Sequence, residues 1–372
     1  MKTGWRSDRS HVMSGFKRWP ILVAALSLVA GCAAGGQQQT ESRSAEEPAQ
    51  ADKEVPDLPQ GSNKGPSTGA LKRKCQVGDP AACMEVGSRH AKGKRAEKDP
   101  EKAAEFFGRA CDGGIGQGCF NLGVMYETGK GVAKSGEKAV SYYDKACGND
   151  QPNACHNLGV MFQKGESVEK SPKEARNFYG KACKGGEARS CFNLGVMYRS
   201  GSGGDKNVEK SVELFDKGCE GGDYVSCYNL GVIYKNGDGV DRDFAKAKSL
   251  YQKACEGDVW AACKNLGMMH NEGLGGEPNP KKAKTLFEKA CSNDEPSACV
   301  HLAAMHFGGQ AGEKDADKAV SLLKKACDQG VPEGCVNLGM LYHKGQFVEQ
   351  DDAKADAYMK KACEQGYEKA CR

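Results

Sequence analysis

Eighteen of the nineteen cysteines in this chain lie on two interleaved grids, and each grid advances by 36 residues. One grid runs from Cys75 to Cys363 and the other from Cys83 to Cys371, with no drift in either. A strict period in this range is typical of stacked supersecondary units, each of which packs on its neighbours. The sequence therefore predicts a solenoid of identical modules rather than one globular core.

Each unit begins with a segment that has the period of a helix. In the segment 119–126, apolar or small side chains recur at Cys119, Leu122, Gly123 and Tyr126, which lie on one face of a helix. A glycine follows this segment in every unit, as a left-handed helix end favours. These glycines are Gly93, Gly129, Gly165, Gly201, Gly237, Gly273, Gly309 and Gly345.

A second helix follows a short loop in each unit. It begins at a residue whose side-chain oxygen can accept hydrogen bonds from the free N–H groups of a helix start. The residues in this register are Asp99, Ser135, Ser171, Asn207, Asp243, Asn279, Asp315 and Asp351. The second helix carries apolar pairs such as Tyr142 and Tyr143 inward and ends at a cysteine of the first grid. Each unit is therefore a helical hairpin, and the predicted fold class is an all-α solenoid of about eight hairpins.

The nineteenth cysteine, Cys32, follows a basic stretch and an apolar run at 21–30, which is the plan of a secretory signal. The run is too short to span a membrane. Residues 28–32 resemble a bacterial lipobox, in which the cysteine thiol receives a diacylglyceryl group and becomes the first residue of the mature chain. We therefore expect residues 1–31 to be a lipoprotein signal peptide and Cys32 to be the lipidation site. Initiation at Met13 would give a signal of more usual length.

Residues 32–68 contain mainly Gly, Gln, Ser, Glu and Pro, a composition that predicts a disordered tether ahead of a repeat domain at 69–372. Removal of 1–31 takes away five positive charges and one negative charge, so the net charge falls from +4 to zero. Without a positive field we expect no nucleic-acid partner. We expect a location in the cell envelope, anchored by lipid. If lipid modification follows bacterial rules, Ala33 carries no retention signal, which favours the outer membrane of a Gram-negative host, facing the periplasm or the cell surface.

Two disulfide schemes suit an antiparallel hairpin, because the end of the second helix lies near the start of its own first helix and near the start of the next. Pairs 28 residues apart would orphan Cys75 and Cys371, whereas pairs eight residues apart use all eighteen cysteines. We therefore predict the pairs Cys75–Cys83, Cys111–Cys119, Cys147–Cys155, Cys183–Cys191, Cys219–Cys227, Cys255–Cys263, Cys291–Cys299, Cys327–Cys335 and Cys363–Cys371. Regular cysteines behind an export signal favour disulfides over a metal array. The spacing also differs from the Cys-x-x-Cys of zinc sites, so we expect no metal and no cofactor.

A basic residue stands two positions before each cysteine of the first grid. The set is Arg73, Arg109, Lys145, Lys181, Lys217, Lys253, Lys289, Lys325 and Lys361. A cation in the last turn of a helix interacts favourably with the helix macrodipole and stabilises the helix by about 0.3 to 1 kcal/mol. A basic binding stripe is the alternative, but a net charge of zero favours the helix-end interpretation.

Three short motifs resemble the Sel1-like repeat, a relative of the tetratricopeptide repeat. They are Asn-Leu-Gly in the first helix, Gly-x-Gly-Val in the loop and Lys-Ala-Cys at the end of the second helix. The cysteine pair narrows the resemblance to the Helicobacter cysteine-rich protein family, over about residues 70–372. Glu85 and Val86 depart from the motif in the first unit, as do His301 and Ala303 in a later one. The family carries a beta-lactamase and penicillin-binding label, so the resemblance also implies β-lactam hydrolysis as an alternative function.

An asparagine recurs two residues after the cysteine of the first helix, off its apolar face. The positions are Asn121, Asn157, Asn193, Asn229, Asn265 and Asn337. In a solenoid of this kind the first helices line a concave groove, where a ladder of amides can bond the backbone of an extended peptide. A repeated structural hydrogen bond between units is the alternative. The residues one turn on are Met125, Met161, Met197, Ile233, Met269 and Met305, for which packing in the core is the favoured role.

Hydrolysis by a serine enzyme of this type needs Ser-x-x-Lys with two companion motifs. Ser-x-x-Lys occurs at Ser135, Ser167 and Ser321, but the companions are absent. The histidines His90 and His306, like His270, replace a tyrosine of the first helix and are expected to act as aromatic substitutes. We therefore predict a monomeric, lipid-anchored scaffold that binds a peptide or an envelope protein in its groove, with no catalytic residue assigned.

Overall fold

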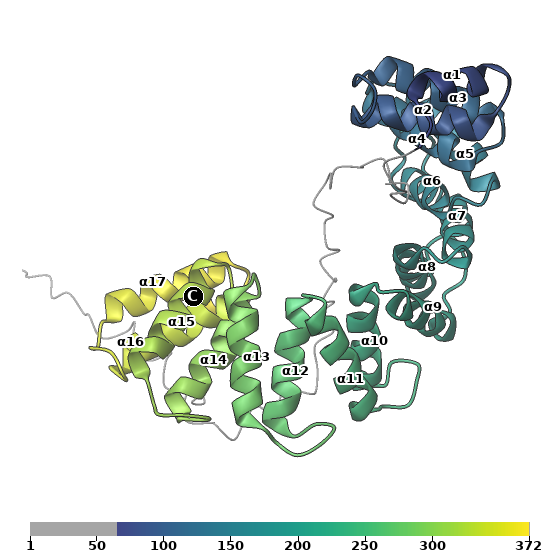
Figure 1. Cartoon of the computed structure of the whole chain (residues 1–372). Coiled ribbons are helices and arrows are strands. Elements are labelled where there is room, and N and C mark those ends of the chain that lie inside the picture. The colour runs from purple at the N-terminus through teal and green to yellow at the C-terminus, as the bar shows by residue number, and fades with distance from the viewer. Residues whose placement is uncertain (1–64, 372) are drawn as a thin grey trace, which may run out of the picture. The chain divides into compact units, whose positions relative to one another are not determined.

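The computed structural model describes residues 65–371, so the predicted signal peptide, Cys32 and nearly all of the predicted tether lie outside it. The described residues form seventeen α-helices and one 3₁₀ helix, and they contain no strand (Figure 1). The bounds are α1 Thr68–Gln76, α2 Pro80–Lys92, α3 Pro100–Asp112, α4 Gly116–Thr128, α5 Gly136–Gly148, α6 Pro152–Lys164, α7 Pro172–Lys184, α8 Ala188–Ser200, α9 Val208–Glu220, α10 Tyr224–Asn236, α11 Phe244–Glu256, α12 Trp260–Glu272, α13 Pro280–Ser292, α14 Pro296–Gly308, α15 Ala316–Asp328, α16 Pro332–Lys344, α17 Asp352–Glu364 and η2 Glu368–Ala370.

The described residues divide into two compact units, 65–279 and 280–371. The first unit holds α1 to α12 and the second holds α13 to α17 with η2. Within each unit, an even-numbered helix packs most extensively on the odd-numbered helix that follows it and less on the one before it. The repeating element is therefore a hairpin that starts with an even-numbered helix, which confirms the predicted all-α solenoid of helical hairpins.

The predicted helix ends are confirmed at all eight glycines and at seven of the eight cap positions. The glycine after each even-numbered helix adopts a left-handed conformation, with φ between 63° at Gly345 and 80° at Gly165. Odd-numbered helices begin with a side-chain oxygen that accepts from the backbone N–H three residues on, as at Asp99, where the distance to the Lys102 nitrogen is 3.0 Å. The same cap occurs at Ser135, Ser171, Asn207, Asp243, Asp315 and Asp351.

The glycine of the Asn-Leu-Gly motif is explained by close packing inside the hairpin. A Cβ atom on Gly123 of α4 would lie 2.7 Å from the ring of Tyr143 in α5, which is fully buried. The same approach recurs at Gly87, Gly159, Gly195 and Gly231. In the hairpin of α14 and α15, Ala303 replaces the glycine and the facing core residue is Leu323, which is not aromatic. The residue at the glycine position of the motif therefore depends on the size of the side chain that faces it from the following helix.

All nine predicted disulfides are present in the structure, each between cysteines eight residues apart. Cys111 lies at the end of α3 and Cys119 near the start of α4, so their disulfide joins one hairpin to the next. In the chain-entropy model, each short closed loop stabilises the fold by about 2 to 3 kcal/mol. The disulfides therefore fix the joints between hairpins rather than the hairpins themselves.

Candidate binding surface on the even-numbered helices

The six asparagines of the predicted ladder differ in their environments. Asn121 is only 1% exposed, and its Oδ1 atom accepts a hydrogen bond from Gln117 Nε2 at 3.0 Å. This buried position does not suit Asn121 for contact with a peptide. The other five asparagines are half-buried: Asn157, Asn193, Asn229, Asn265 and Asn337.

Residues in the asparagine register face the buried ring of the preceding hairpin. Burial, followed by the charge and hydrogen bond of Glu127, raises the pKa of Tyr143 far above its usual range, and a hydrogen bond from the Asn157 side chain opposes this rise. His301 holds the same register in α14, and its ring stacks on Phe287 with centroids 5.2 Å apart. The structural role between units is therefore present at Asn157 and His301, whereas Asn229 Nδ2 donates to the Val225 carbonyl of its own helix at 2.8 Å. The five asparagines nevertheless remain partly exposed.

Valines next to these amides give the exposed side of the even-numbered helices an apolar component. Val160 and Val232 are half-buried, and Val196 is 40% exposed, which is unusual for a large apolar side chain among residues 65–371. Each valine lies three residues after an asparagine and therefore shares its helix face. We call this surface the even-helix face, defined by Asn157, Val160, Asn193, Val196, Asn229 and Val232. Its alternating amides and apolar side chains suit contact with a polypeptide backbone and its side chains.

The methionines one turn after the asparagines lie in the core. Met125 and Met161 are each 5% exposed, and Met269 is fully buried. Met197, Ile233 and Met305 are likewise buried. The favoured interpretation as core residues is thus confirmed, and the even-helix face does not include them.

A polar cluster between α6 and α8 was not predicted from the sequence. His156 Nδ1 lies 2.7 Å from Ser190 Oγ and 3.2 Å from the Glu187 carboxylate. Although burial opposes its ionisation, hydrogen bonds from His156 and Ser190 lower the pKa of Glu187 to about 2. Both contacts use the same ring nitrogen and Ser190 is fully buried, so this is a link between hairpins rather than a catalytic triad. Histidine at the position after Cys155 was the available signal, but its partners are more than thirty residues away.

Basic residues at the ends of the odd-numbered helices contact the preceding hairpin. Lys253 Nζ donates to the Cys219 carbonyl at 2.8 Å, and Lys325 Nζ donates to the Cys291 carbonyl at 2.7 Å. Lys361 reaches the Asp328 carboxylate in the same way. The helix-end interpretation holds with one refinement: these cations act on the last turn of the previous odd-numbered helix as well as on their own.

The other residues considered for chemistry have structural roles. Ser135 caps α5, and Ser167 lies in a loop with a φ of 64°. His90 stacks on Phe106, as expected of an aromatic substitute. Within residues 65–371, no three His, Cys, Asp or Glu side chains are grouped to hold a metal ion, and no helix is long and apolar enough to cross a membrane.

Comparison with known proteins agrees with this architecture. The Sel1 repeat matches eight times, at 80–115, 116–150, 152–187, 188–223, 225–259, 260–295, 296–331 and 332–367. A search of curated protein sequences gave no match. Among solved structures, the chain is similar to c5321, a protective antigen of uropathogenic Escherichia coli that displays an SLR fold. The two share 29% identity with a TM-score of 0.75, and the match covers 82% of this chain. The chain spans 66% of the length of c5321, which is slightly under two thirds.

Two further structures are similar to this chain. A Sel1 repeat protein from Oxalobacter formigenes has a TM-score of 0.64 and 23% identity, over 82% of this chain and 89% of that one. Helicobacter pylori cysteine rich protein B is 30% identical, with a TM-score of 0.29, over 35% of this chain and 93% of that one. The molecule is thus a helical repeat scaffold stapled by disulfides. It belongs to the Sel1 repeat family, as the resemblance in the sequence predicted, and Sel1 repeat proteins mediate protein–protein interactions.

Proposed function

We propose that this protein is an exported, lipid-anchored scaffold that binds a peptide or an envelope protein on its even-helix face. The carrying observation is that face itself, where half-buried amides alternate with valines as exposed as Val196. An asparagine side chain offers two donors and an acceptor, which match the needs of an extended backbone. The valines supply the apolar area that gives such a contact its affinity.

The disulfide joints support this role because they hold successive binding positions at a fixed spacing. Asn157, Asn193 and Asn229 stand on hairpins joined through Cys183–Cys191 and Cys219–Cys227. A rigid surface loses little conformational freedom when a partner binds, so more of the contact energy appears as affinity.

The cysteine chemistry also supports export. Nine disulfides persist only where the surroundings are oxidising, as in the periplasm or at the cell surface. Cys32 and residues 32–68 would then supply the lipid attachment and the tether, which hold the repeats at the membrane. In contrast, β-lactam hydrolysis has little support, since two of the three serines of the Ser-x-x-Lys matches, Ser135 and Ser167, have the structural places given above and the companion motifs are absent.

Site-specific photocrosslinking in a bacterial cell envelope tests the proposal. A photoreactive amino acid replaces Val196, and the matched control places it at Val77, which is 85% exposed but lies outside the even-helix face. We expect a discrete crosslinked product from position 196 that is lost when Asn193 and Asn229 are changed to Ala. Equal products from both positions, or a product that survives the asparagine changes, would show that the even-helix face is not the binding surface.

A further inference from the structure

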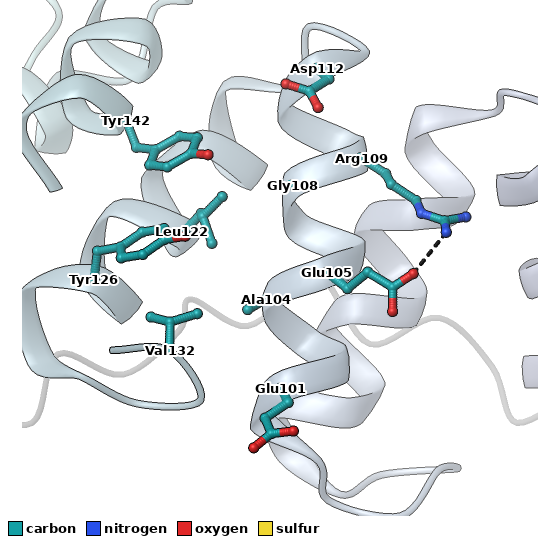
Figure 2. Close-up of a pocket in the computed structure, with 10 residues that line it drawn as sticks. All are labelled: Glu101, Ala104, Glu105, Gly108, Arg109, Asp112, Leu122, Tyr126, Val132 and Tyr142. Carbon is teal, nitrogen blue, oxygen red and sulfur yellow. Dashed lines mark hydrogen bonds and ion pairs between the residues drawn. The ribbon is translucent and has the colours of Figure 1, made fainter. Parts of the chain in front are cut away.

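An open pocket of about 340 Å³ lies at the joint between the first two complete hairpins (Figure 2). One wall is α3, which contributes Glu101, Ala104 and Asp112. The opposite wall is formed by Tyr126 of α4 and Tyr142 of α5, whose rings are stacked with centroids 5.4 Å apart. Figure 2 shows the Tyr142 hydroxyl directed toward α3. The pocket uses none of the residues of the even-helix face.

The pocket is open because its floor carries small side chains. Ala104 and Gly108 line α3 here, and Ala104 has the same register in its hairpin as Arg176 in α7, two periods further along the chain. At that later joint the guanidinium carbon of Arg176 lies 3.5 Å from the centroid of the Tyr198 ring. Arg176 Nη2 also donates to the Asp205 carbonyl at 3.2 Å. The same niche is thus filled from within by a cation at one joint and left open at another.

Other joints repeat the filled arrangement. Lys248 and Lys284 hold the register of Ala104 in α11 and α13. Their Nζ atoms approach Gly276 and Gly312 of the following loops, where an added Cβ atom would lie 3.4 Å from the nitrogen in each case. These glycines hold the register of Val132, which lines the open pocket. A resident cation is therefore a recurring occupant of this niche in the described hairpins.

The open pocket has the charge that a cation requires. Three carboxylates line it, from Glu101, Glu105 and Asp112, together with the cation of Arg109. The ammonium groups of Lys138 and Lys145 lie over the rings of Tyr126 and Tyr142, 5.1 and 5.4 Å from the ring centroids, as Lys210 lies over Tyr198 at the joint that Arg176 fills. Glu105 is paired with Arg109 at 2.7 Å, whereas Glu101 and Asp112 form no ion pair within the described part of the chain. Partial burial, the neighbouring Tyr126 and the Asp112 carboxylate together raise the pKa of Tyr142, which keeps its hydroxyl protonated and able to accept a hydrogen bond through its oxygen.

We propose that the pocket between α3, α4 and α5 binds a cationic side chain, arginine in particular, from a protein partner. The incoming guanidinium would take the place that Arg176 holds at the α7–α8 joint, between the tyrosine wall and the carboxylates of α3. Planar, weakly hydrated guanidinium groups combine hydrogen bonding to carboxylates with contact to aromatic rings, so arginine suits this lining better than lysine does.

The test is an NMR titration of the disulfide-bonded protein with ¹³C-labelled tyrosine rings. The probe is acetyl-arginine amide, and acetyl-citrulline amide is the matched probe of the same shape without charge. We expect saturable shifts of Tyr126 and Tyr142 with the arginine probe alone, and weaker binding at higher ionic strength. Ala104→Arg, which copies the filled joint, removes these shifts. Glu101→Gln with Asp112→Asn, at two exposed positions, lowers the affinity up to about fivefold for each carboxylate.

Equal shifts with both probes, or no saturable shift with the arginine probe, would overturn the proposal. Shifts that persist unchanged in folded Ala104→Arg would also overturn it, because the niche would then not be the binding place. If Ala104→Arg does not fold, the Glu101 and Asp112 double variant decides: an affinity for the arginine probe equal to that of the parent protein rejects the site.

Discussion

The hairpins α4/α5 and α14/α15 have the same architecture but meet the close approach of their helices differently. In the first, Gly123 allows the Tyr143 ring to lie on the backbone of α4. In the second, Ala303 and Leu323 fill the same space, and both are almost fully buried. The difference shows that what these hairpins share at this position is the combined size of two facing side chains, one on each helix, rather than the identity of either residue. An exchange of one partner alone should therefore break a hairpin, and an exchange of both should restore it.

The largest effect is expected from breaking the joints that both hairpins share. Reduction of all nine disulfides removes a constraint worth about 2 to 3 kcal/mol at each joint, so the repeats should melt at a much lower temperature. Thermal unfolding followed by circular dichroism, with and without a strong reductant, measures the change. An unchanged midpoint, with all thiols shown to be free by alkylation, would contradict the role given to the disulfides.

Gly123→Ala is the next largest change. The added Cβ atom would lie 2.7 Å from the Tyr143 ring, and overpacking of this kind costs about 1 to 3 kcal/mol in the free energy of unfolding. Gly123→Ala combined with Tyr143→Leu copies the α14/α15 hairpin and should be more stable than Gly123→Ala alone. Urea unfolding of four proteins, namely the parent, Gly123→Ala, Tyr143→Leu and the double variant, gives the coupling energy.

The reciprocal exchange is the control for that experiment. Ala303→Gly removes a methyl group without creating a clash, so it should cost only about 1 kcal/mol through backbone entropy. If Gly123→Ala costs no more than Ala303→Gly, and its cost is the same with and without Tyr143→Leu, the size-matching explanation of the motif is wrong.

A second comparison concerns the joints, which are apolar at some hairpins and ionic between α6 and α8. Because the folded pKa of Glu187 is depressed to about 2 from an ordinary 4.5, its stabilising effect is present above pH 4.5 and is lost as the pH falls toward 2. The effect amounts to at most about 3 kcal/mol. Urea unfolding at several pH values should therefore show Glu187→Gln destabilised at pH 6 and close to the parent protein near pH 2.5. The exposed Glu220→Gln serves as the control, and a pH-independent cost of Glu187→Gln would exclude the ionic link.

Much of the fold could be predicted because it depends on local rules that repeat. A helix end is specified by Gly129 after α4 and a helix start by the oxygen cap at Asp99. Cysteines eight residues apart specify a joint within one period. The surface could not be predicted in this way, because it depends on which side chains meet across a joint. Asn121 and Asn193 share a register, yet one is buried and the other is half-exposed.

The smallest predicted effect concerns the cations at the helix ends, and it separates contact between hairpins from charge alone. Lys253→Met removes the hydrogen bond to the Cys219 carbonyl, so it should cost about 0.5 to 1 kcal/mol in the free energy of unfolding. Lys173→Met removes another exposed cation from the first turn of α7, where a positive charge is unfavourable to the helix dipole, so its effect should be zero or slightly stabilising. Urea midpoints measured side by side at low salt resolve the two. Equal midpoints would mean that the lysines contribute only to the overall charge, whereas a loss confined to Lys253→Met shows that each hairpin closes the last turn of the one before it.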